Sequence, residues 1–144
     1  MSNDRRYHDS VYRKAKRAGA KVITIEPFGA EVFLFRGVSA FCSQFEKIFG
    51  VTPNPPDARY VMGFYGAEDL GGGEGVHVIC VGDEHGVDYP EDVIWHEALH
   101  CTVCVLDQFG VRFDVENHEL YAYTQGFIAR SVRELLFPEE GMNV

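Results

Sequence analysis

The chain has 144 residues, of which 46% are hydrophobic and 24% charged, as in a single globular domain with its own core. Its formal charge of -9 is unevenly spread: residues 1–21 hold seven of the thirteen Lys and Arg but only two of the 22 acidic residues. The rest therefore has six basic and twenty acidic side chains, which repel phosphate backbones, so no nucleic-acid partner is expected.

Targeting signals and a disulfide framework are both missing from the sequence pattern. No apolar run approaches the roughly 20 residues of a membrane span, and the polar, basic N-terminus lacks a signal-peptide core. Four cysteines are too few for a disulfide scaffold of this length. We therefore expect a cytoplasmic protein without membrane contact, in which residues 1–20 form a basic arm or short helix and residues 21–144 form one domain.

Hydrophobic periodicity and turn residues predict the secondary structure. The predicted elements, in chain order, are a basic helix over 7–18, strands over 22–25 and 32–35, a helix over 39–49, strands over 59–65 and 76–81, a helix over 90–108, and a last helix that begins between 114 and 117 and ends before Pro138. Pro90 suits the first turn of a helix, and Gly110 is a C-terminal stop signal. This order predicts an α+β fold with a small, mostly antiparallel sheet packed against the last two helices.

A metal-binding pattern lies at the centre of the predicted helix over 90–108. Residues 96–100 read His-Glu-Ala-Leu-His, the HExxH pattern. On a helix, His96 and His100 stack one turn apart on the same face, so both imidazoles can reach one ion about 2 Å away. Glu97 is rotated by about 100° and can reach a zinc-bound water rather than the metal. The pattern predicts one Zn²⁺, with Glu97 as general base.

A third protein ligand must come from outside the pentapeptide. The metzincin pattern requires Gly and His at the positions of Val103 and Leu106, so that family is excluded. Peptide deformylases use an upstream cysteine in a Glu-Gly-Cys segment, which the surroundings of Cys80 do not match. Glu119 follows His100 after eighteen intervening residues, at the start of the last predicted helix. It is therefore the leading candidate for the third ligand.

This spacing resembles the gluzincin metallopeptidases, which include thermolysin and aminopeptidase N. The resemblance covers roughly residues 76–130 and implies a zincin-like fold, with His96, His100 and Glu119 as zinc ligands and Glu97 as the base. Residues 117–126 also resemble small zincin-like proteins of tailed bacteriophages, which implies a virus-encoded protein. The resemblance has departures, because the aminopeptidase exopeptidase signature is missing and Tyr123 stands where thermolysin-type enzymes have an Asp that orients a ligating His.

Three further residues are auxiliary candidates. The Tyr123 hydroxyl is a candidate for a hydrogen bond to an oxyanion or a ligand, and Asp107, two turns after His100, is the alternative orienting group. His118, next to Glu119, is the alternative third ligand or a group that polarises a substrate carbonyl. The Cys101 and Cys104 pair, by contrast, is expected to be small apolar packing within a helix.

The expected function is a zinc hydrolase, and the resemblance to gluzincins implies a metallopeptidase. The strand over 76–81 is expected to offer an edge along which a polypeptide substrate adds, with residues 71–73 as a flap. The alternative is a non-catalytic zinc domain that acts in assembly or as an adaptor by binding a protein partner. The two differ at the fourth coordination position, which is a water in a catalytic site and a protein ligand in a closed structural site.

Overall fold

The computed structural model describes residues 13–15, 17, 19–49, 63–69, 75–82 and 90–139. Its elements are β1 (Lys21–Ile25), β2 (Ala30–Arg36), α2 (Val38–Phe49), β3 (Gly63–Asp69), β4 (Gly75–Val81), α3 (Pro90–Gln108) and α4 (His118–Leu136). The helices predicted over 39–49 and 90–108 and the last helix are confirmed to within a residue or two. The flap predicted at residues 71–73 lies outside the described residues.

The four described strands form one mixed sheet in the order β1-β2-β4-β3. The β1–β2 and β3–β4 pairs are antiparallel, as expected, but β2 and β4 pair in parallel. This arrangement contradicts the prediction that residues 76–81 form an edge. The chain leaves β2, passes through α2 and returns to the sheet at β3, and β4 then pairs antiparallel with β3 on one side and parallel with β2 on the other. As a result β4 lies inside the sheet and β3 lies at its edge.

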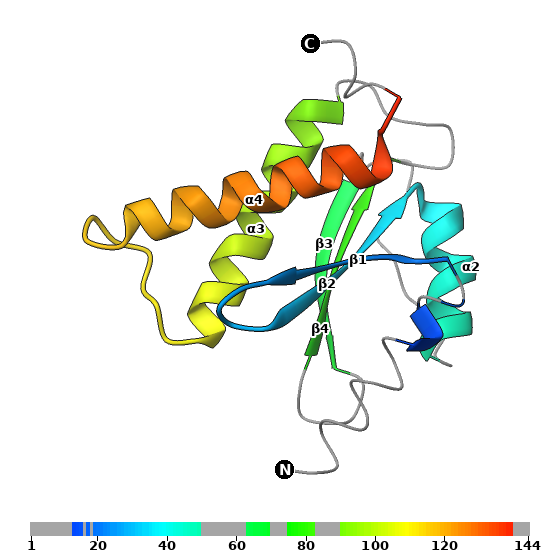
Figure 1. Ribbon diagram of the computed structural model, residues 1–144, viewed down its shortest axis with the longest axis horizontal. Coiled ribbons are helices and arrows are strands. Elements are labelled where there is room, and N and C mark those ends of the chain that lie inside the picture. The colour runs from blue at the N-terminus through cyan, green and yellow to red at the C-terminus, as the bar shows by residue number, and fades with distance from the viewer. Residues whose placement is uncertain are drawn as a thin grey trace.

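Helices cover both faces of the sheet (Figure 1). On one face, α3 and α4 pack on alternate residues of β1, β2 and β4, with Ile94, Ile128 and Val132 fully buried. On the other face, α2 packs its phenylalanine stripe against Phe33 and Phe35 of β2. The domain is therefore an α+β fold of three layers, in which the inner strands are apolar on both faces.

The α2 layer gives a direct test of this packing. The Phe45 ring is 2% exposed and lies 5.2 Å from the Phe41 ring, centre to centre. Replacing Phe45 with Ala is expected to lower the free energy of unfolding by about 3–5 kcal/mol, because the change leaves a cavity. Phe113, 66% exposed, is the matched control, and its replacement with Ala is expected to cost about 1 kcal/mol through the lost contact with Tyr121. Urea unfolding measures both values, and equal losses would contradict the assignment of the core.

The turn after α3 sets the direction of α4. Gly110 has a φ of 79°, the left-handed conformation that favours glycine at a helix end. The Gly110 N–H donates to the Asp107 carbonyl at 2.9 Å and the Val111 N–H donates to the Leu106 carbonyl at 2.8 Å, which together make a Schellman turn. The chain then returns along α3, where the Gln125 amide donates to the Trp95 carbonyl at 3.2 Å. Among the described helices, none is both long and apolar enough to cross a membrane.

Candidate metal centre

The inner and outer faces of α3 have different compositions. Ile94, Ala98, Cys101 and Val105 point into the core and are no more than 1% exposed. His96 and His100, which lie on the opposite side of the helix, are both exposed, and the His96 side chain is 68% exposed. The apolar side therefore anchors the helix, and the histidine pair faces solvent, where an ion and a substrate can reach it.

The two imidazoles are arranged as a metal site requires. Their Nε2 atoms lie 3.2 Å apart, and the rings are 4.8 Å apart, centre to centre, and nearly perpendicular. This distance also allows the two neutral rings to share one proton. For an ion about 2.05 Å from both nitrogens, the nitrogen–ion–nitrogen angle would be about 100°, which is close to the tetrahedral value. The donor set and its spacing therefore fit zinc.

Glu97 lies next to the exposed histidine pair on α3, but its own side chain is buried, with 7% of the residue exposed. Its Oε1 atom lies 3.9 Å from His96 Nε2. Burial raises the pKa of the Glu97 carboxyl, and the nearby His96 and His100 partly offset this by lowering it. A carboxylate whose proton affinity is raised and which lies beside, but not between, the two imidazoles has the properties of a general base.

Glu119 is not gathered with the histidine pair. It lies in the first turn of α4, where its side chain is 72% exposed and its Oε1 atom is 3.5 Å from His118 Nε2. Within the described ranges, no three His, Cys, Asp or Glu side chains form a group that could hold a metal ion. The structure thus brings together His96, Glu97 and His100, while the assignment of Glu119 as the third ligand stays a prediction.

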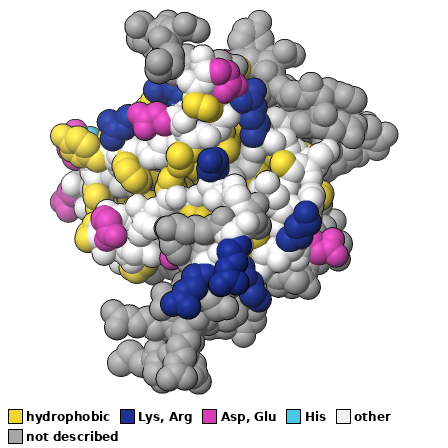
Figure 2. Space-filling model, turned by 45° about the vertical axis from the view of Figure 1, so that its right-hand side comes forward, with side chains coloured by type: hydrophobic (Ala, Val, Ile, Leu, Met, Phe, Trp, Pro, Cys, Tyr) yellow, Lys and Arg dark blue, Asp and Glu magenta, His cyan; other side chains and the backbone are white. Residues whose placement is uncertain are grey.

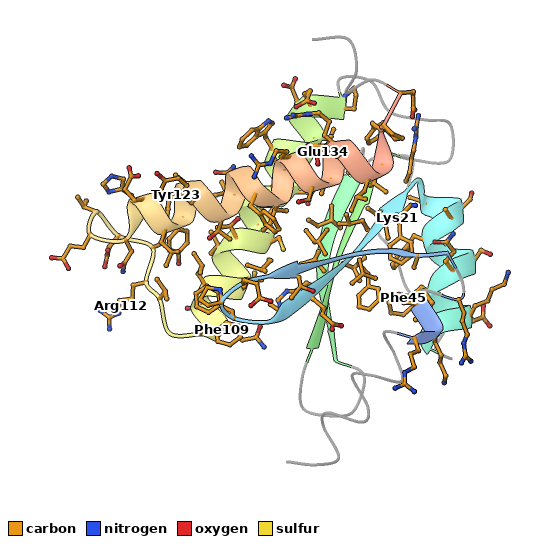
Figure 3. All side chains as sticks on the ribbon, viewed as in Figure 1. Lys21, Phe45, Phe109, Arg112, Tyr123 and Glu134 are labelled. Carbon is orange, nitrogen blue, oxygen red and sulfur yellow. The ribbon has the colours of Figure 1, made fainter. Side chains whose placement is uncertain are left out.

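The auxiliary candidates lie at the N-terminal half of α4 and the end of α3. Tyr123 is 75% exposed, and Figure 3 shows it on the part of α4 that lies farthest from the sheet. His118 donates through Nδ1 to the Val115 carbonyl, which ties it to the turn before α4. Burial and the negative charges of Asp107 and Asp114 raise the pKa of Tyr121. Asp107 therefore lies near enough to Tyr121 of α4 to act on it electrostatically. Their predicted roles in orienting a ligand or a substrate therefore stay predictions.

Two features of the site were not anticipated from the sequence. Cys101 is buried as expected, but Cys104 is exposed, so the expectation of apolar packing is wrong for Cys104. The helical period was the available signal, because Cys104 follows His100 by one turn and shares its face. The second feature is that the apolar side chains of Trp95 and Leu99, 41% and 39% exposed, flank the histidine pair.

Comparisons of the chain with known protein families, with curated proteins and with solved structures found no match.

Proposed function

We propose that the protein is a zinc-dependent hydrolase that cleaves peptide bonds. His96 and His100 hold the metal, and Glu97 is the general base. The observation that carries this proposal is the pair of exposed imidazole nitrogens 3.2 Å apart beside a carboxylate that is 7% exposed. A buried carboxylate whose pKa is raised, next to two converging imidazoles with solvent access, is a candidate functional site on physical grounds.

Each residue of the helix has a distinct task. Zinc, when bound, supplies a Lewis acid that polarises a carbonyl and makes water more acidic. Glu97 accepts the proton of the attacking water and later delivers it to the leaving amine. The core contacts of α3 fix the histidines and Glu97 relative to one another before substrate arrives. In this proposal Glu119 completes the ligand set and Tyr123 donates a hydrogen bond to the developing oxyanion.

The position of β3 favours an extended polypeptide as substrate. Within the described part of the sheet, β3 has a neighbour, β4, on one side only. The other edge can accept backbone hydrogen bonds from an added strand. Since α3 packs beside β3 as well as β4, that edge lies next to the helix that bears the histidine pair. The proposal includes a zincin-like arrangement. In this arrangement the antiparallel edge strand β3, the inner strand β4 and the HExxH helix α3 follow one another along the chain.

The proposal is tested by removing and restoring the metal. Zinc-loaded protein is expected to cleave a mixture of unstructured peptides, to lose this activity after dialysis against a chelator, and to regain it with one equivalent of zinc. Mass spectrometry of the products gives the cleaved bonds. Binding of one equivalent of zinc without any cleavage would reject the hydrolase and favour the non-catalytic zinc domain.

A further inference from the structure

The turn between α3 and α4 forms a tip that exposes apolar side chains. We define the tip as residues 109–123. Phe113, Val115 and Tyr123 are 66%, 83% and 75% exposed, and the acidic residues Asp114, Glu116 and Glu119 are exposed among them. In Figure 1 the tip projects away from the sheet. Exposed large apolar side chains gathered on a projection are typical of an interaction surface.

The tip is held in one conformation by its own hydrogen bonds. The Tyr121 hydroxyl donates to the Val111 carbonyl at 2.8 Å, and its ring centre lies 4.7 Å from that of Phe113. The Asn117 side chain donates to the Arg112 carbonyl at 3.1 Å, and the Asn117 N–H donates to Asp114 Oδ1 at 3.0 Å. A partner that docks here loses little free energy to ordering the turn.

The chemistry of the tip selects a cationic partner. Carboxylates beside aromatic rings bind guanidinium and ammonium groups, through charge-assisted hydrogen bonds to the acids and cation–π contacts with the rings. The chain has such groups in its basic N-terminal segment. Arg13, Lys14, Arg17 and Lys21 are all exposed, and Arg13 and Arg17 are one helical turn apart.

One molecule cannot join these two surfaces to each other. Arg112 and Tyr123 lie at one end of the molecule and Lys21 at the other side of the sheet (Figure 3). Figure 2 shows one group of Lys and Arg side chains at the lower centre of the face in view, and hydrophobic side chains more frequent toward its left-hand side. A second copy can supply the basic surface that the tip requires.

We propose that the tip of one molecule docks in a head-to-tail contact on the basic surface of a second copy, which is formed by Arg13, Lys14, Arg17 and Lys21. Such a contact is heterologous and leaves one free tip and one free basic surface, so it can add further copies. The charge division of the chain agrees, since residues 1–21 carry a net charge of +5 (seven minus two) and residues 22–144 a net charge of -14 (six minus twenty). The tip includes Glu119 and Tyr123, which the proposed function assigns to the zinc site, so the contact is tested on metal-free protein.

Sedimentation velocity of the whole, chelator-treated chain tests the contact. At 20 mM NaCl the weight-average sedimentation coefficient is expected to rise with protein concentration. Raising the NaCl concentration to 500 mM is expected to lower the association constant at least tenfold. The double variant Glu116→Lys/Glu119→Lys makes the tip basic, and Arg13→Glu/Arg17→Glu removes the net positive charge of the basic surface, because the two glutamates offset Lys14 and Lys21. Each variant alone is expected to be monomeric. An equimolar mixture of the two is expected to associate again, because the native tip of the second variant then meets the native basic surface of the first.

Glu134→Lys, an exposed charge reversal elsewhere on α4, is the matched control and is expected to associate as the wild type does. A wild-type chain that stays monomeric at low salt, or a mixture that fails to associate, would overturn the proposal. Loss of association in Phe113→Ala without any effect of the charge reversals would indicate tip-to-tip contact instead. Binding of an unrelated arginine-rich peptide to a wild-type chain that stays monomeric would assign the tip to another protein.

Discussion

Replacement of Glu97 with Gln is expected to lower the rate of peptide hydrolysis by about 10³-fold while the protein keeps one zinc ion. Gln has nearly the same shape, so it fills the same site on α3, but its carboxamide cannot accept a proton from water. The side chain is 7% exposed, and burial raises the pKa of the native carboxyl, so the ionised form is disfavoured there. The variant is therefore expected to be as stable as the wild type or slightly more stable.

The measurement is kcat/KM for one peptide, with the zinc content determined on the same sample. Glu116→Gln is the matched control, since Glu116 is exposed on the turn before α4 and its replacement is expected to leave the rate unchanged. A Glu97→Gln variant that binds zinc and hydrolyses at the wild-type rate would exclude Glu97 as the base. Loss of zinc in this variant would instead show that Glu97 is a ligand.

Removal of either imidazole is expected to weaken zinc binding by more than about 100-fold. Loss of a group that merely orients a ligand already costs 10- to 100-fold in metal affinity, so loss of a ligand costs more. His96→Ala and His100→Ala are both solvent-facing changes, and the apolar face of α3 is untouched, so the fold is expected to remain. Competition with a chromophoric zinc chelator measures the affinity, and circular dichroism checks the helix content.

The same assay decides between the candidates for the third ligand. Glu119→Gln is expected to weaken zinc binding to a similar degree, and His118→Ala is expected to leave it within a few-fold of wild type. The reverse order would assign His118 as the ligand. Wild-type affinity in both variants would exclude Glu119 and His118 as the third ligand, and wild-type affinity in His96→Ala would remove the basis of the site.

The sequence predicts α3 and its histidine pair well because the signals are local. Pro90 begins the helix as expected, and Gly110 ends the turn that follows it. The convergence of His96 and His100 follows from the helical period alone, and the structure confirms it with the 3.2 Å separation of the Nε2 atoms. The burial of Phe41, Phe45 and Ile48 likewise follows from their spacing in α2.

The features that depend on distant parts of the chain were not predicted. The continuous apolar runs of β2 and β4 indicate inner strands, but they do not indicate that these two strands are neighbours, because that depends on where the chain returns to the sheet after α2. Placing Glu119 requires the direction of α4, which is set by the Gly110 turn and by the contact of Gln125 with Trp95. Spacing along the chain cannot supply that direction, so spacing alone left the third ligand unsettled.

The most direct test of the metal centre is X-ray absorption spectroscopy at the zinc edge on the purified wild-type chain with its zinc content determined. The account predicts one zinc per chain with two imidazole nitrogens at about 2.0–2.1 Å and the remaining ligands oxygen. Absence of stoichiometric zinc, or a coordination shell dominated by sulfur at about 2.3 Å, would contradict it.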